Sequence, residues 1–81
     1  MRDAKIYQNV SHAQFSALAA KAQENGIAIT DDKGSAKKLG VEVAWDYNDV
    51  TLTLSLQVLH TPIFVSAETV EDKLAEMVVN A

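Results

Sequence analysis

The chain has 81 residues, of which 48% are hydrophobic and 22% charged, a balance that predicts one globular domain spanning residues 1–81 and excludes a disordered chain. A formal net charge of −4 sets up an acidic field that repels phosphate backbones, so nucleic acid is not an expected partner. Cysteine is absent, which removes disulfides as a source of stability and fits a reducing compartment.

The N-terminal stretch MRDAKIYQNV carries no sign of a targeting segment. It lacks the apolar core and the small-residue cleavage site of a signal peptide. No run in the chain approaches the ~20 apolar residues that cross a bilayer, so no membrane association is expected. These features predict a cytoplasmic protein.

A first helix is predicted from about His12 to Asn25. Ser11 can cap its first turn, and Gln14, three residues later, can complete a capping box. Gly26 follows as a residue that takes positive φ at little conformational strain. The apolar positions of the helix then share one narrow face: Phe15, Leu18, Ala19 and Ala22.

The segment after this helix, at 27–40, has a less regular sequence pattern. IAIT, at 27–30, is rich in β-forming residues and predicts a strand, and DDKG, at 31–34, is typical of a turn. SAKKLG, at 35–40, fits either a polar edge strand or a single turn. We favour the edge strand, as an extension of the short strand before it.

The strongest pattern in the chain is an alternation of apolar and polar residues over 41–58, which predicts an antiparallel hairpin. Asn48-Asp49 is expected at its tip. The facing pairs are then Tyr47 with Val50, Trp45 with Leu52, Val43 with Leu54, and Val41 with Leu56. This register places every large side chain on one face and buries both aromatic rings in the core.

The opposite side of the hairpin is called the polar face below, and we expect it to be exposed to solvent. Its predicted members are Glu42, Ala44, Asp46, Thr51, Thr53, Ser55 and Gln57.

Pro62 ends the hairpin, and a second helix is predicted with Ser66 as its N-cap. Its buried stripe is expected to consist of Val70, Leu74, Met77 and Val78. Four carboxylates are expected on its solvated face: Glu68, Glu71, Asp72 and Glu76. The predicted fold class is therefore α+β, a two-layer sandwich in which a three-stranded antiparallel sheet carries the N- and C-terminal helices on one face, in the order α-β-β-β-α.

Two short motifs in the second half of the chain resemble a known pattern. The residues GVEVAWDY, at 40–47, match G-V-x-x-x-W-x-Y, and PIFV, at 62–65, matches P-x-F-V. A hairpin of the first type that runs into a segment of the second type is similar to a family of short uncharacterised bacterial proteins. That family has no assigned activity, so the resemblance implies no functional residue.

Residues that could carry out chemistry do not form a recognisable pattern. His12 and His60 are the only histidines, one at a helix start and one at a strand end, so no metal site is expected. The aspartates lie in predicted turns, and no serine lies in a G-x-S-x-G motif. GSAKKLG lacks the spacing of a phosphate-binding loop. We expect no enzymatic activity and no cofactor.

Leu59, Ile63 and Phe64 remain unplaced once the core stripes are assigned. They predict an apolar interaction patch at the strand-to-helix junction, used by a homo-oligomer or a protein partner. Three alternatives stay open. The helices and sheet could hold a small apolar ligand between them, the polar face could bind weakly as a hydroxyl array, or the unplaced residues could fold under the second helix of a monomer.

Overall fold

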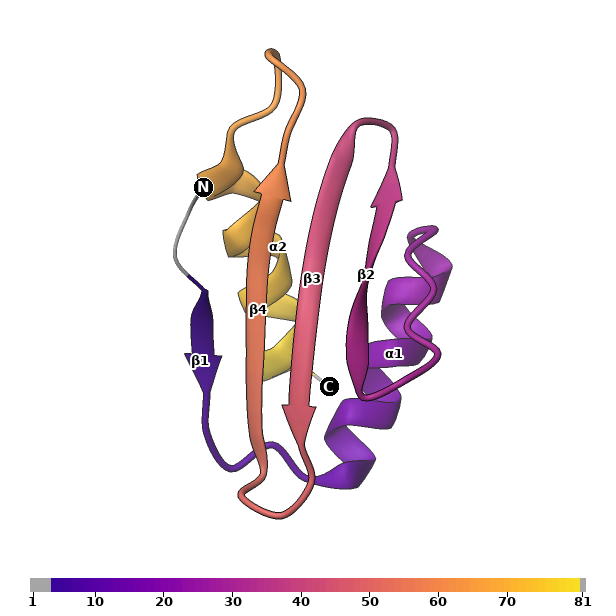
Figure 1. Cartoon of the computed structure of the whole chain (residues 1–81), viewed down its shortest axis with the longest axis vertical. Helices are drawn as coiled ribbons and strands as arrows, with labels where there is room; N and C mark the ends of the chain where they lie inside the picture. The colour runs from indigo at the N-terminus through magenta and orange to yellow at the C-terminus, as the bar shows by residue number, and fades with distance from the viewer. Residues whose placement is uncertain (1–3, 81) are drawn as a thin grey trace.

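The computed structural model describes residues 4–80, which form a sheet layer and a helix layer (Figure 1). The elements in chain order are β1 (Lys5–Tyr7), α1 (His12–Glu24), β2 (Lys33–Lys38), β3 (Val41–Asn48), β4 (Thr53–His60) and α2 (Ala67–Val79). All strand pairs are antiparallel, in the order β1-β4-β3-β2. In the figure α2 lies behind β4 and β3, and α1 lies to the side of β2 and partly behind it. The α+β class and both helices are confirmed, whereas the three-stranded sheet is wrong.

The additional strand is β1, which pairs with β4 through Lys5 opposite Leu56 and Tyr7 opposite Leu54. A strand of three residues has too little alternation to be recognised locally, because its stability comes from its neighbour in the sheet. β1 covers an edge of β4 that the sequence prediction left open.

Helix α1 begins and ends as its sequence predicts. The Ser11 hydroxyl accepts from the Gln14 backbone N–H at 3.1 Å, and the Gln14 side chain accepts from the Ser11 N–H at 3.0 Å. At the other end Gly26 has φ of 85°, and the Ile27 N–H donates to the Ala22 carbonyl oxygen at 2.8 Å. This last bond, together with the one from Gly26 to the Gln23 carbonyl oxygen, is a Schellman motif.

The strand predicted at 27–30 is absent, and the segment is irregular. Ile27 and Ile29 still pack against the core, as alternate residues, but they have no ladder partner. The edge of β3 is occupied by β2 instead, which begins at Lys33, within the predicted turn. The choice of an edge strand over a turn is confirmed for residues 35–38, although the strand begins two residues earlier than this segment and Leu39-Gly40 form a turn.

A two-residue turn, Leu39-Gly40, joins β2 to β3. Their φ values are 53° and 84°, so both residues are in the left-handed region, as a type I′ turn requires. This turn fixes the β2–β3 register, with Ala36 opposite Val43 and Gly34 opposite Trp45. Gly34 allows the indole ring to lie against β2, since a Cβ there would approach the ring to 3.1 Å.

The β3–β4 hairpin exists, but its predicted register is wrong. Trp45 faces Leu56 rather than Leu52, and Tyr47 faces Leu54 rather than Val50. Asn48 causes the difference, because its side-chain oxygen accepts the N–H groups of Val50 at 2.9 Å and Thr51 at 3.1 Å and opens a loop at 49–52. Trp45 and Tyr47 therefore each face a β4 residue four positions later than predicted. Because this shift is an even number of residues, the apolar residues that remain in the strands keep the predicted face.

The predicted burial of both aromatic residues is confirmed, since Trp45 is 4% and Tyr47 5% exposed. The Trp45 indole N–H donates to the Asp31 carbonyl oxygen at 2.8 Å, and the Tyr47 hydroxyl donates to the Val10 carbonyl oxygen at 2.6 Å. Both polar atoms therefore retain partners inside the molecule. The whole buried cluster comprises Val10, Leu18, Ala22, Val43, Trp45, Tyr47, Leu54, Leu56, Val58, Leu74, Met77 and Val78.

Helix α2 follows Ser66, which holds the N-cap position without a side-chain capping bond. Its predicted apolar stripe is confirmed, with Val70 only partly buried. Glu71 was expected on the solvated face but is 7% exposed. Burial, and then the nearby Glu71 carboxylate, raise the pKa of Tyr7 above its ordinary value, which places this glutamate beside the unpredicted strand β1.

The polar face of the sheet is the side without helices (Figure 1). Asp46 is exposed there, whereas Thr53, Ser55 and Gln57 are half-buried by their neighbours across the strands. Thr51 lies in the loop after β3 and does not belong to this face. The expected solvent exposure of this face is therefore only partial.

Candidate functional site

An apolar hollow lies where the β2–β3 turn meets the chain after α1 and the β4–α2 connection. We call it the apolar groove. Its volume is about 530 Å³, and its lining is Asn25, Ile27, Lys38, Leu39, Val41, Phe64 and Val65. A volume of this size matches the range of small-molecule and side-chain sites.

Local structure fixes each wall of the apolar groove. The Schellman motif of α1 turns Ile27 back toward the sheet. The left-handed turn places Leu39 at the rim, and Gly40 lets that turn approach Pro62, to which an added Cβ would lie 3.2 Å away. The Val65 N–H donates to the Pro62 carbonyl oxygen at 3.0 Å and closes the short turn that carries Phe64.

The rim of the groove consists of large apolar side chains exposed to solvent. Leu39 and Phe64 are each 84% exposed, and neighbouring Ile63 is 103% exposed. A small monomer usually buries residues of this kind, so a group of them around a hollow makes this end of the molecule a candidate interaction site.

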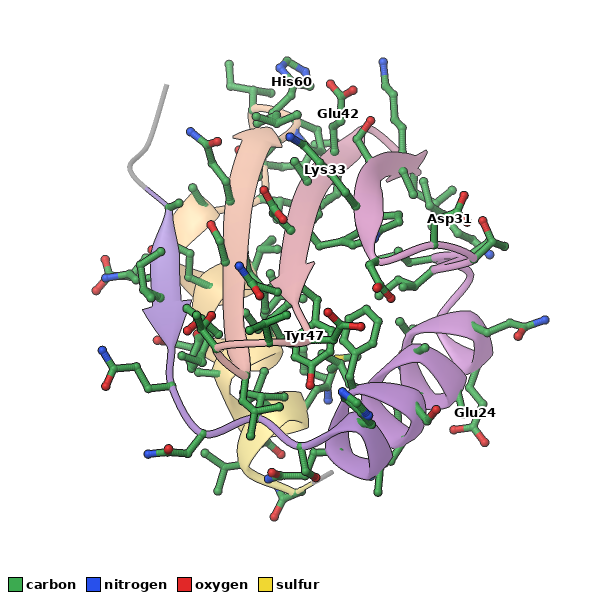
Figure 2. All side chains as sticks on the ribbon, turned by 60° about the horizontal axis from the view of Figure 1, so that its bottom comes forward. Glu24, Asp31, Lys33, Glu42, Tyr47 and His60 are labelled. Carbon is green, nitrogen blue, oxygen red and sulfur yellow. The ribbon has the colours of Figure 1, made fainter. Side chains whose placement is uncertain are left out.

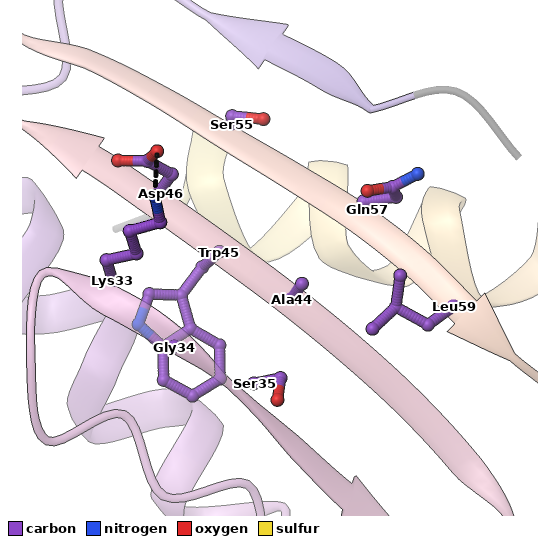
Figure 3. Close-up of a pocket in the computed structure, with 9 residues that line it drawn as sticks. All are labelled: Lys33, Gly34, Ser35, Ala44, Trp45, Asp46, Ser55, Gln57 and Leu59. Carbon is purple, nitrogen blue, oxygen red and sulfur yellow. Dashed lines mark ion pairs between the residues drawn. The ribbon is translucent and has the colours of Figure 1, made fainter.

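The structure separates the predicted interaction patch into two parts. Phe64 lines the apolar groove and Ile63 precedes it in the chain, but Leu59, near the C-terminal end of β4, lines a different hollow on the polar face. That hollow has a volume of about 460 Å³ and is floored by small side chains such as Ala44 (Figure 3). An exposed ion pair crosses one end of it, with Lys33 Nζ 3.7 Å from the Asp46 carboxylate.

A third feature is an aromatic cluster at the opposite end of β3. The rings of Phe15 and Tyr47 stack with centroids 4.3 Å apart, and His12 meets Tyr47 edge-on at 6.2 Å. Burial, then Asp49 and Asp32, raise the pKa of Tyr47 above its ordinary value, because each disfavours the phenolate. The phenol is thus held in its protonated, hydrogen-bond-donating form.

The two histidines lie at opposite ends of the sheet. His12 Nε2 lies 3.3 Å from the Asp49 carbonyl oxygen, and the His12 ring is near Tyr47. His60 faces Glu42 across the strands (Figure 2). Among residues 4–80, no group of three or more histidine, aspartate or glutamate side chains is arranged to hold a metal ion.

Of the residues that line the groove, the predicted interaction patch contained only Phe64. Among those it missed, Ile27, Leu39 and Val41 were assigned to strands or to an ambiguous segment. A signal for Leu39 does exist, because Leu39-Gly40 joins two segments that read as strands and so occupies the position where Asn-Gly usually stands. Ile27 could not be placed, since its position depends on how α1 packs.

Comparisons with protein-family models, with curated proteins and with solved structures found no match for the chain. The resemblance of its hairpin and P-x-F-V segment to short bacterial proteins therefore stays a prediction. No helix within residues 4–80 is long and apolar enough to cross a bilayer.

Proposed function

We propose that the protein is a small non-enzymatic binding module that self-associates through the apolar groove, with a second copy of the chain as the occupant. The observation that carries the proposal is Leu39. A leucine in the left-handed region is strained by roughly 1–2 kcal/mol, and its side chain is 84% exposed, so it contributes little to the stability of the monomer. Its apolar atoms instead add to the rim of the groove.

The shape of this end suits a two-fold dimer. An isologous interface uses the same patch on both partners, so the patch must contain protruding and recessed parts. Ile63 protrudes into solvent beside a groove whose recessed walls include Ile27 and Val41. A second copy turned by 180° would bring its own protruding residue to the first copy's groove.

The exposed area is sufficient for a modest interface. Leu39, Ile63 and Phe64 together present on the order of 500 Å² of apolar surface, against the ~800 Å² that each partner buries in a standard interface. A second copy also adds burial to a domain of 81 residues, near the size at which one core is marginally stable.

The test is the molar mass of the purified protein, measured by sedimentation velocity over a range of concentrations. Wild type is expected to dimerise, and Phe64→Ser is expected to raise the dissociation constant about 100-fold or more, because two copies of the ring lose burial. Val50→Ser is the matched control, since Val50 is 87% exposed but lies in the loop at the other end of β3. A wild type that stays monomeric at the highest soluble concentration contradicts self-association.

A second function is favoured by the volume and apolar lining of the same groove. A hollow of about 530 Å³ that opens between the sheet and the segment after α1 could hold a small apolar ligand. Native mass spectrometry separates the two functions. A dimer without added mass supports self-association, and a monomer that retains a small apolar molecule supports the carrier.

A further inference from the structure

The outer edge of β2 is a second surface, separate from the apolar groove. β2 is the last strand of the sheet, and within residues 4–80 no strand pairs with its outer side. It runs for six residues, Lys33–Lys38, with no proline. An edge of this length without a paired strand is able to pair with another extended chain.

The ladder shows which backbone groups of β2 face outward. In an antiparallel pair, alternate residues bond to the neighbouring strand. The Tyr47 N–H donates to the Asp32 carbonyl oxygen at 2.7 Å, so Asp32 directs its backbone toward β3. Every second residue after it, Gly34, Ala36 and Lys38, therefore also bonds to β3. Lys33, Ser35 and Lys37 therefore direct their N–H and C=O groups away from the sheet.

Charge distinguishes this edge from the rest of the protein. β2 holds three of the chain's seven basic residues and no acidic one, although the chain as a whole has a net charge of −4. All three lysines are exposed. Across the ladder Lys33 lies opposite Asp46 and Lys37 opposite Glu42. The Lys33–Asp46 ion pair joins side chains that are 78% and 55% exposed, and solvent screens such a pair strongly.

We propose that the β2 edge binds an extended acidic peptide segment by strand addition. The peptide backbone bonds to the outward groups of Lys33, Ser35 and Lys37. The side chains of these residues share one face, so Lys33 and Lys37 meet peptide positions four residues apart. The preferred ligand thus carries carboxylates at i and i+4, because opposite charges directly across strands stabilise the pair.

One self-pairing of this edge is disfavoured. A two-fold antiparallel pairing of β2 with itself, centred on Ser35, places Lys33 opposite the copy's Lys37. Like charges directly opposite each other destabilise paired strands. A peptide that supplies carboxylates at these two positions avoids this repulsion.

The experiment measures fluorescence anisotropy of a labelled seven-residue peptide with glutamate at its second and sixth positions and threonine or valine elsewhere. We expect saturable binding to the full chain that weakens as salt rises. A peptide with lysine at both positions is expected not to bind. Exchanging Lys33 and Lys37 for Glu should reverse this preference. Absence of binding by the acidic peptide at low salt overturns the proposal and leaves the lysines as protection against edge pairing.

Backbone bonding is tested separately from charge. Ser35→Pro removes one outward N–H and should weaken binding about tenfold, whereas Ser35→Ala should bind as wild type does. The intrinsic fluorescence of Trp45 reports whether the proline variant folds. Independently of that variant, N-methylation of the peptide at the residues that face β2 should abolish binding, and N-methylation at the alternate residues should not. Equal binding of the two methylated peptides overturns strand addition.

Discussion

Two leucines with left-handed backbones flank β3, one before it and one after it. Leu39 has φ of 53° and Leu52 has φ of 56°. Leu52 is half-buried, and its carbonyl oxygen accepts the Val10 N–H at 2.8 Å. The Val10 carbonyl oxygen in turn accepts the Tyr47 hydroxyl at 2.6 Å. Leu39 is 84% exposed, on the rim of the apolar groove.

The difference shows that a strained backbone does not by itself mark a functional site. At the Leu52 end, hydrogen bonds and packing within the monomer offset the strain, and the residue serves the fold. At the Leu39 end, the monomer buries little of the side chain, so the strain has no comparable compensation there. Strain combined with apolar exposure is what singles out the apolar groove.

The largest expected effect is at Trp45, whose ring joins β2 and the segment after α1 to the centre of the sheet. Trp45→Ala should lower the free energy of unfolding by ~3–5 kcal/mol, because it leaves a cavity and removes the donor to Asp31. Urea titration followed by circular dichroism measures this, with Trp45→Phe as a milder control. A water-like emission spectrum from folded wild type would contradict the burial on which the prediction rests.

The Leu52 end should depend on the Tyr47 hydroxyl. Tyr47→Phe keeps the ring stacked on Phe15 but leaves the Val10 carbonyl oxygen without this donor, at an expected loss of ~1–3 kcal/mol. Tyr7→Phe is the matched control, because Tyr7 is only partly buried and belongs to the short strand β1. Equal losses in the two variants would show that the hydroxyl bond does not stabilise this end of the molecule.

The same residue predicts a dependence of stability on pH. Burial, then Asp49 and Asp32, raise the pKa of Tyr47 above 10.0, so the folded state holds the phenolic proton more tightly than the unfolded state does. This contribution is fully present below pH 10 and is lost as pH rises through the higher pKa of the folded state. Unfolding measured between pH 8 and pH 11 should show a decline above pH 10 that is shallower in Tyr47→Phe.

A smaller effect of opposite sign is expected at Leu39 but not at Leu52. Leu39→Asn should raise the free energy of unfolding by ~1 kcal/mol, because asparagine tolerates the left-handed region and little apolar burial is lost. Leu52→Asn should give no such gain, since it removes a half-buried side chain. The measurement uses dilute protein, to keep dimerisation out of the comparison. A gain at Leu52 and not at Leu39 would reverse our assignment of the two ends.

The smallest effects are expected from two isolated apolar side chains on the surface. Val50→Ser and Ile63→Ser should each change the stability of dilute protein by no more than ~0.5 kcal/mol, because Val50 is 87% and Ile63 103% exposed. At high concentration only the Ile63 variant should fall below wild type in melting temperature, since a dimer stabilises its folded partners. Identical behaviour of the two variants at every concentration would separate Ile63 from any interface.

Local sequence determined the parts of this protein whose causes are local. The capping box of Ser11 and Gln14, the glycine stop of α1 and the apolar stripe of α2 depend on residues within one or two turns of each other. The apolar face of the hairpin was also predictable, because alternation with a period of two assigns faces even when the register is wrong. Ile63 and Phe64 could also be singled out from the sequence, because no helix or strand pattern assigns them a buried position.

Tertiary structure decided the features that depend on distant partners. β1 exists because β4 offers an edge, and the hairpin register follows from the side chain of Asn48 and from Val10 bonding to Leu52. The burial of Glu71 depends on the packing of α2 against the rest of the fold, and the apolar groove forms only where three separate segments meet. Periodicity identifies which side of an element is apolar, but which neighbour covers that side is set by packing between residues far apart in the chain.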